Sequence, residues 1–372
     1  MARRVGFRHT VSGEKSLSGK PMKLLLLAGW ALSSALGLMA QDKPADQNEA
    51  VPTLHAYADL VQMPTLVLNQ DRKRIEPRID ERRFSISVDS GPWFQVTHVR
   101  PQGDDPISLS ILLDPGAVDL MPNLDREIAG LVPNLLTPRD RVSLYGLACN
   151  LTRSLNDAPV DSARLLARVD ALVTPWMALR GKEPRCTQQP VRLWDALGFV
   201  AKQMEALPGR RVILVISDGH DKGSVRTWNE VRAYAQVVSI AVFGIIRTQV
   251  LGSSVTAPMP ARNDAYPFLS ICELSGGMLM PTMPGLMEKT LQRFMTMLRE
   301  RYVLEFPRPS NSTQGAHSVQ IKIAGGNSYF IRSTGVSALL PDDAVLNDPT
   351  TVPSDPSRAP EQGKRRVLLP PK

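Results

Sequence analysis

Two long apolar runs that each end in an aspartate constrain the fold of this chain most strongly. The runs are ISLSILLD at 107–114 and RVILVISD at 211–218, and each is followed by small or turn-forming residues. An apolar run of this kind that leads into a helical pattern is typical of a parallel strand buried on both faces. Because such sheets bind ligands beyond the carboxyl ends of their strands, we expect Asp114 and Asp218 to share one crevice.

The pattern of elements around these runs predicts an α/β fold with a doubly wound, mostly parallel, Rossmann-like sheet. From residue 107 onward, strand-like and helical patterns alternate, which places helices on both faces of a sheet. The expected strands are 107–113, 141–148, 211–217, 237–246 and 278–280, with helices including 193–207 and 285–301. Further β-like pieces occur before this region at 54–61, 65–69, 84–88 and 93–100, and after it at 302–306, 318–323 and 329–332.

These patterns divide the chain into six segments. The central α/β domain is expected at 105–301, between a small β-rich domain at 53–104 and a C-terminal β extension at 302–336. The proline-rich, weakly apolar segment 337–372 is predicted to be a disordered tail. At the other end we expect a signal peptide at 1–40 and a linker at 41–52.

The N-terminal pattern indicates export. A basic stretch ends at Lys23, an apolar run follows to Ala40, and the next residues are polar, which is typical of a signal peptide cleaved after Ala40. A membrane anchor is the alternative, although the apolar run is short for a span. Met22 is an alternative start. We therefore predict a periplasmic, cell-envelope or secreted protein, with membrane contact only through this signal.

The net charge of +8 does not support a nucleic-acid partner. Residues 1–40 hold six basic residues and one acid, so about +3 remains for the mature chain. The sequence contains no dense Lys/Arg stripe interleaved with aromatic residues, which nucleic-acid binding would favour.

Three cysteines in an exported chain allow one disulfide and one free thiol. Cys149 is expected at the end of a strand and Cys186 in a loop on the same rim, so we propose these two as a possible pair. Free cysteines throughout are the alternative. Cys272 lies in an apolar segment, where we expect a buried and inert thiol.

Several short motifs together resemble the von Willebrand factor type A domain. They are the ISLSILLD start, LWDAL at 193–197 and PGRRVILVISDGHD at 208–221, and the match covers roughly residues 60 to 335. The β-rich leader and the ending LRERYVLEF at 298–306 resemble, more narrowly, the acidobacterial proteins related to this family.

The resemblance implies a metal-ion-dependent adhesion site at the top of the sheet, but its ligands are largely missing. In the family a divalent cation is held by an Asp-x-Ser-x-Ser loop, a threonine from a second loop and a later aspartate. Here the two serine positions are Gly116 and Val118, and the threonine position falls on or near Val191, although Thr187 is an alternative. Hard cations need oxygen ligands, so Asp114 and Asp218 alone predict a degenerate site with no metal, or weak magnesium binding at most. Asp119, His220 and Asp221 are further candidate ligands.

The sequence therefore predicts a binding protein rather than an enzyme. It contains no nucleophile elbow, Walker loop or zinc-protease motif, so we expect no catalytic residues and no cofactor. The leading hypothesis is a non-enzymatic protein-binding module whose partner is unidentified and whose oligomeric state is open. The alternatives are a structural or assembly component of the cell envelope, a metal-dependent adhesin with altered ligands, and a hydrolase that uses Asp114 and Asp218 as a carboxylate pair.

Overall fold

The computed structural model describes most of the chain between His55 and Ala338. The described residues are 55–57, 60–73, 78–114, 123–131, 135–178, 191–221, 223–247, 266–307, 315–325, 329–338 and 351–353. The predicted signal peptide and linker lie outside them. Among the residues in these ranges, we find no helix with the length and apolar character that a membrane span requires.

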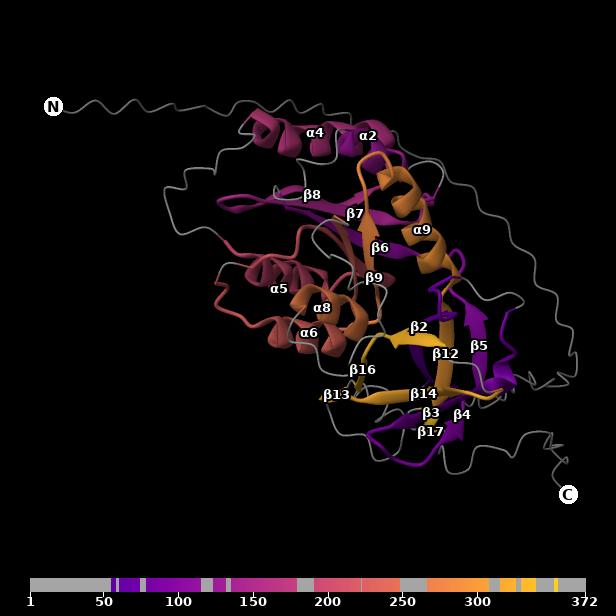
Figure 1. Ribbon diagram of the computed structural model, residues 1–372. Coiled ribbons are helices and arrows are strands. Elements are labelled where there is room, and N and C mark those ends of the chain that lie inside the picture. Colours follow the sequence, from indigo (N-terminus) through magenta and orange to yellow (C-terminus); the bar gives the residue numbers. More distant parts are fainter. Residues whose placement is uncertain are drawn as a thin grey trace, which may run out of the picture. The chain divides into compact units, whose positions relative to one another are not determined.

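A six-stranded, mostly parallel sheet forms the centre of the described chain (Figure 1). Its strands are β6 (Ile107–Leu113), β7 (Arg141–Leu147), β8 (Leu151–Pro159), β9 (Arg210–Ile216), β10 (Ala241–Arg247) and β11 (Leu279–Thr282). They lie in the order β11-β10-β9-β6-β7-β8, and only β8 among them runs antiparallel to its neighbour. This is the strand order of a doubly wound sheet, with its switch point between β6 and β9. The fold class predicted from the sequence is confirmed.

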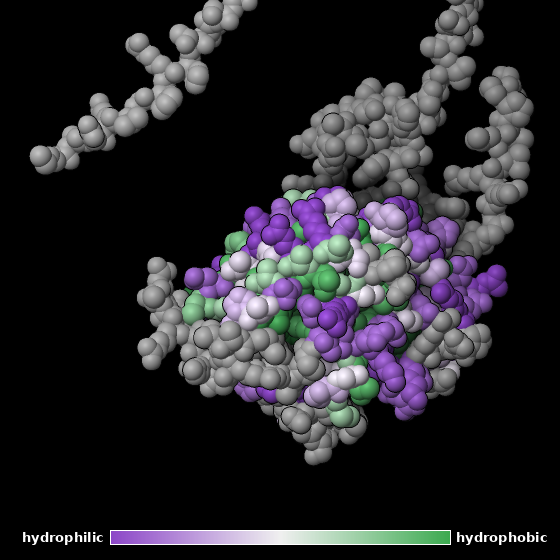
Figure 2. Space-filling model, turned by 90° about the horizontal axis from the view of Figure 1, so that it is seen from above, coloured by the Kyte–Doolittle hydropathy of each residue, from purple (hydrophilic) through white to green (hydrophobic). Residues whose placement is uncertain are grey.

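Helices cover both faces of this sheet and create two separate hydrophobic cores. One face carries α2 (Leu124–Ala129), α4 (Ser162–Ala178) and α9 (Met287–Glu300), and the other carries α5 (Leu193–Met204), α6 (Trp228–Val237) and α8 (Pro267–Leu274). Alternate residues of β9 serve the two cores, since Leu214 packs in the first and Val215 in the second. Viewed from the side of α2 and α4, the described surface mixes hydrophilic and hydrophobic residues (Figure 2).

The β-rich segments before and after the central domain combine into one structure, here called the flank module. Its strands are β2 (Leu60–Leu68), β3 (Phe84–Val88), β4 (Phe94–Gln95), β5 (His98–Pro101), β12 (Tyr302–Pro307), β13 (Gly315–His317), β14 (Val319–Ile323), β15 (Phe330–Ser333) and β16 (Val336–Ala338), with the 3-10 turn η1 (Glu81–Arg83). Its larger sheets have the orders β15-β2-β12-β5 and β14-β3-β4. A third core, which includes Met63, Phe84 and Phe306, lies within it. The segments 53–104 and 302–336 thus share sheets and a core.

The structure differs from the sequence prediction in several local features. The edge strand β8 was not predicted because it is largely polar and partly exposed. The strand β2 runs unbroken through Pro64, where the sequence indicated two pieces because proline lacks an amide donor. The helix α6 continues to Val237, so β10 begins at Ala241. Within the segment expected to be a disordered tail, β17 (Thr351–Pro353) pairs with β1 (His55–Tyr57), and its β-branched residues favour a strand.

The flank module contacts the central domain at the amino-terminal ends of its strands. Arg210, the first residue of β9, donates to Asp105 at 3.2 Å and to Gln62 of β2 at 2.7 Å. A second contact involves the buried carboxylate of Glu273 in α8, which pairs with Arg72 at 3.2 Å and with Arg332 of β15 at 2.7 Å. The carboxyl ends of the strands lie at the opposite end of the sheet from these contacts.

Candidate functional site at the carboxyl ends of the strands

Asp114 and Ser217 meet at the switch point of the sheet. The parallel register pairs Leu113 with Ile216, so the residues that follow them lie side by side. The Ser217 hydroxyl donates a 2.6 Å hydrogen bond to the Asp114 carboxylate, and the Gly219 amide donates to the same hydroxyl at 3.0 Å. Ser217 is fully buried. One carboxylate predicted from the sequence therefore lies at the switch point, where the crevice is expected, and accepts a bond from a buried hydroxyl.

The second predicted carboxylate, Asp218, forms a two-pronged ion pair with Arg247. The register of β10 against β9 pairs Ile245 with Ile216, which sets Arg247 beside Asp218. The Arg247 Nε donates to Asp218 Oδ1 at 2.7 Å, and its Nη2 donates to Oδ2. The side chains are 26% and 12% exposed, so the pair lies partly removed from water. Both oxygens of this carboxylate are thus engaged by one guanidinium.

Of the positions where the family has its serine and threonine ligands, the structure describes Val191, which has no hydroxyl. Val191 is half-buried against the second core, and its amide donates to the Cys149 carbonyl at 3.0 Å. Gly116, Val118, Asp119 and the alternative Thr187 lie outside the described residues. Cys149 is disulfide-bonded, whereas Cys186 lies outside the described residues. The pairing of the two stays a prediction.

Cys272 is the free cysteine among the described residues. It lies fully buried in α8, and burial raises the pKa of its thiol well above the ordinary value. A thiol that stays protonated is a poor nucleophile. The expectation of a buried Cys272 is confirmed.

A network of hydrogen bonds fixes the loop that follows Asp218. Asp221 accepts bonds from the Ser224 hydroxyl at 2.6 Å and from the Ser224 amide at 2.9 Å. Ser224 accepts from the Trp194 and Asp195 amides at the start of α5, and Asp195 accepts in return from the Val225 amide at 2.8 Å. The carboxylates of Asp221 and Asp195 therefore stabilise the loop and the helix start.

This loop packs tightly against α8, and several of its described side chains are exposed to solvent. Gly219 has a φ of +74°, and a Cβ atom there would lie 2.7 Å from the Phe268 ring, so the position requires glycine. His220 is exposed, and the Val225 side chain is 90% exposed. Hydrogen bonds and packing thus hold the described residues of the loop, while an apolar side chain points into water.

Sequence reasoning missed Arg247 and Ser217 as members of the site. The signal for Arg247 was a charged residue at the end of the apolar run AVFGIIR, whose carboxyl end lies at the same edge as Asp218. Within the part of the chain that the structure describes, no cluster of three or more His, Cys, Asp or Glu side chains is placed to hold a metal ion.

Comparison with known proteins gives likenesses of fold. No protein-family model matches the sequence, and no curated protein matches it. Among solved structures, the conserved hypothetical protein BatB from Bacteroides thetaiotaomicron is 16% identical, with 52% of this chain and 100% of that chain covered and a TM-score of 0.34. Proximal thread matrix protein 1 from the mussel byssus, with a zinc-occupied MIDAS motif, is 9% identical, with coverages of 57% and 49% and a TM-score of 0.38.

A third solved structure is the manganese-loaded TRAP protein of Plasmodium vivax. It is 14% identical, with 63% of this chain and 96% of that chain covered and a TM-score of 0.31. At these identities the likenesses concern the fold, and none of them assigns a ligand or partner to this chain. The doubly wound sheet agrees with the von Willebrand A-like fold that the sequence motifs imply.

Proposed function

We propose that this chain is a non-enzymatic protein-binding module that recognises its partner without a metal ion. The observation that carries the proposal is the ion pair of Asp218 with Arg247 at the carboxyl ends of β9 and β10, next to the switch point. A carboxylate at this edge of the sheet requires a positive charge to compensate it. Here the guanidinium of the neighbouring strand supplies that charge, so Asp218 has no electrostatic need for a bound cation.

The donor set fits a hard divalent cation poorly. Magnesium requires near-octahedral oxygen ligation, and two carboxylates alone fill only part of that shell. Both oxygens of Asp218 accept from Arg247, and one oxygen of Asp114 accepts from Ser217. A cation would have to displace the guanidinium, and Val191 offers only hydrocarbon at the position where a threonine hydroxyl is expected.

The same contacts argue against an acid–base role for the two aspartates. A carboxylate pair that catalyses hydrolysis must present its oxygens to the substrate. Both Asp218 oxygens are directed to Arg247 instead, and the buried Ser217 hydroxyl holds Asp114. We therefore propose a binding role for the crevice rather than a catalytic one.

We propose that recognition uses the rigid loop around Val225. The bonds from Asp195, Asp221 and Ser224 fix the backbone, so little conformational entropy would be lost on binding. The exposed Val225 side chain supplies apolar contact area at the rim of the crevice. Loops held on a rigid sheet are common places for recognition, and this one needs no cation to form.

A pull-down from cell-envelope extract tests the proposal. Bait proteins are the wild type, Val225→Asp and the control Leu166→Asp, which places the same charge on an exposed side chain of α4. We expect wild type and control to capture the same protein in magnesium and in EDTA, and Val225→Asp to capture much less of it. Loss of the wild-type complex in EDTA, or equal capture by Val225→Asp, would contradict the proposed mode of binding.

We also propose that the chain is exported, as the N-terminal sequence predicts. The segment concerned lies outside the described residues, so the proposal rests on its basic and apolar pattern. Fractionation of the native cells and mass analysis of the mature protein provide the test. The expected result is an envelope or secreted chain that begins at Gln41. A cytoplasmic chain that retains residues 1–40 would refute it.

A further inference from the structure

A cavity of about 260 Å³ lies between helix α9 and strand β2, away from the crevice described above. Its apolar lining includes Leu66 and Leu68 of β2, Met297 of α9 and the Tyr302 ring. Side chains alternate along β2, so Leu66 and Leu68 face α9 while Met63 and Val67 belong to the flank core. The cavity is therefore lined by apolar side chains where the central domain meets the flank module.

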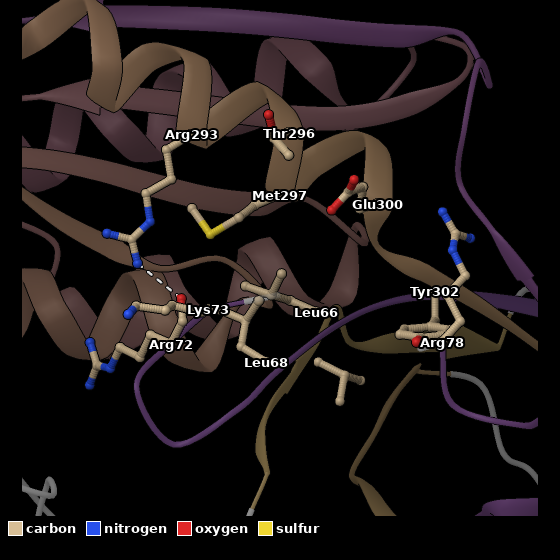
Figure 3. A pocket seen from close by; sticks show the side chains of 11 residues that line it. Leu66, Leu68, Arg72, Lys73, Arg78, Arg293, Thr296, Met297, Glu300 and Tyr302 are labelled. Carbon is tan, nitrogen blue, oxygen red and sulfur yellow. Dashed lines mark hydrogen bonds between the residues drawn. The ribbon is translucent and has the colours of Figure 1, made fainter. Parts of the chain in front are cut away.

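Four cations also line this cavity, against one acidic residue among its described lining. They are Arg72, Lys73, Arg78 and Arg293, and the acid is Glu300. Figure 3 shows Arg72, Lys73 and Arg293 gathered at one end of the cavity, with Arg78, Glu300 and Tyr302 at the other and Met297 between them. Two chemically different parts thus adjoin, one cationic and one apolar.

The charge at the cationic end is compensated only in part among the described residues. Arg72 pairs with Glu273, but among the described residues neither Lys73 nor Arg293 forms an ion pair. The pKa of the Arg293 guanidinium lies below its ordinary value, because burial disfavours the charged form and the like charge of Arg72 disfavours it further. An anion placed between these groups would relieve both effects.

The turn that presents these cations is fixed in place. The Asn69 carbonyl accepts from the Arg72 amide at 2.9 Å, and the Asn69 side chain accepts from the Lys73 amide at 2.8 Å. Arg72 has a φ of +59°, a left-handed conformation that is uncommon for any residue except glycine, and its carbonyl accepts from Arg293 Nη2 at 2.9 Å. Strained residues of this kind concentrate at binding sites, because the surrounding structure must hold them.

We propose that this cavity binds a small organic anion with an apolar body, such as a medium-chain carboxylic acid. Its anionic group would lie among Arg72, Lys73 and Arg293, and its hydrocarbon would pack against Leu66, Leu68 and Met297. A few well-placed polar groups around an apolar hollow are the usual features of a small-molecule site. The occupant is a free molecule rather than a membrane surface, because the apolar side chains line a recess between elements.

Calorimetric titration of the purified full chain with three probes tests the proposal. The probes are octanoate, octyltrimethylammonium with the same chain and opposite charge, and acetate with the same charge and no chain. We expect octanoate to bind at one saturable site, and the other two to bind at least about tenfold more weakly. Equal binding of octyltrimethylammonium, or no saturable binding of octanoate, would overturn the proposal.

Matched variants then locate the site. Arg293→Gln and Lys73→Gln each remove one charge from the cavity, and each is expected to weaken octanoate binding about tenfold. Lys289→Gln makes the same change of charge on an exposed position of α9 and is expected to bind as the wild type does. Thermal melts verify that all three variants fold.

Two further results would also overturn the proposal. One is undiminished octanoate binding in both cavity variants. The other is sedimentation with phosphatidylglycerol vesicles without any binding of soluble octanoate, because the ligand would then be a lipid surface. Neither result bears on the crevice, so this site and the proposed protein-binding function are tested independently.

Discussion

Replacing Arg247 by methionine tests whether the guanidinium stabilises the crevice in place of a cation. Unit charges about 4 Å apart attract by about 4 kcal/mol at the effective dielectric constant of about 20 near protein surfaces. Desolvation offsets much of this, and hydrogen bonds to charged groups contribute about 1.5 to 3 kcal/mol net. Since the two side chains are 26% and 12% exposed, we expect a coupling free energy between Arg247 and Asp218 of about 2 kcal/mol, intermediate between exposed and buried pairs.

A double-mutant cycle in urea measures this coupling directly. The proteins are the wild type, Arg247→Met, Asp218→Asn and the double variant, compared by unfolding midpoint at constant slope. The control is Arg226→Met, which removes the partner of Asp195 at a side chain that is 59% exposed and should cost less than about 1 kcal/mol. A coupling below about 0.5 kcal/mol would refute the reasoning, because Arg247 would then behave as an ordinary surface residue.

Three further perturbations test the packing and the pH response of the described chain. Glu273→Gln should lower the free energy of unfolding by about 3 kcal/mol in urea, because it leaves two arginines without their buried carboxylate. Arg301→Met should raise the free energy of unfolding by about 1 kcal/mol, since Arg301 is 1% exposed and burial lowers its pKa to about 9. The one hydrogen bond described for its side chain goes to Gln102. The hydrogen bond from His317 lowers the pKa of Asp89 below its ordinary 3.8, so this group stabilises the fold above that value and the contribution is lost as the pH falls through the lowered pKa. Unfolding midpoints measured against pH should therefore fall less steeply below about pH 4 in Asp89→Asn than in the wild type.

The central sheet was predictable because its strands carry their own signal. A strand buried on both faces reads as a continuous apolar run, and β6 and β9 are such runs. The two aspartates were predictable for the same reason, since the carboxyl end of a buried strand is visible in the sequence. The expectation that they share one crevice rests on a general rule about doubly wound sheets rather than on any local pattern.

The features that the sequence did not predict depend on contacts between distant residues. The edge strand β8 is defined by its pairing with β7, because its own residues are largely polar. Pro64 lies in a strand with partners on both sides, and only the pairing of β2 with β12 and β15 shows this. Arg247 was missed because its partner is set by the register of β10 against β9, which no spacing in the sequence reveals.

The flank module joins segments from before and after the central domain, and its position limits where a partner can bind. Strand β2 lies between β12 and β15, so residues from before and after the central domain share one sheet. Arg100 and Arg210 converge on Asp105, and Arg299 pairs with the buried Asp140, which accepts from the Ile107 amide at the start of β6. These contacts fasten the flank module to the amino-terminal ends of the strands. The Asp218–Arg247 pair and the Val225 loop lie at the carboxyl ends of the strands. Doubly wound sheets bind their ligands at that end. The flank module covers the other end of the sheet, which is consistent with the proposed binding at the carboxyl ends. Accordingly, a partner whose binding is abolished by changes at Arg210 or Gln62, but not at Val225, would place the interface on the wrong edge for this mechanism.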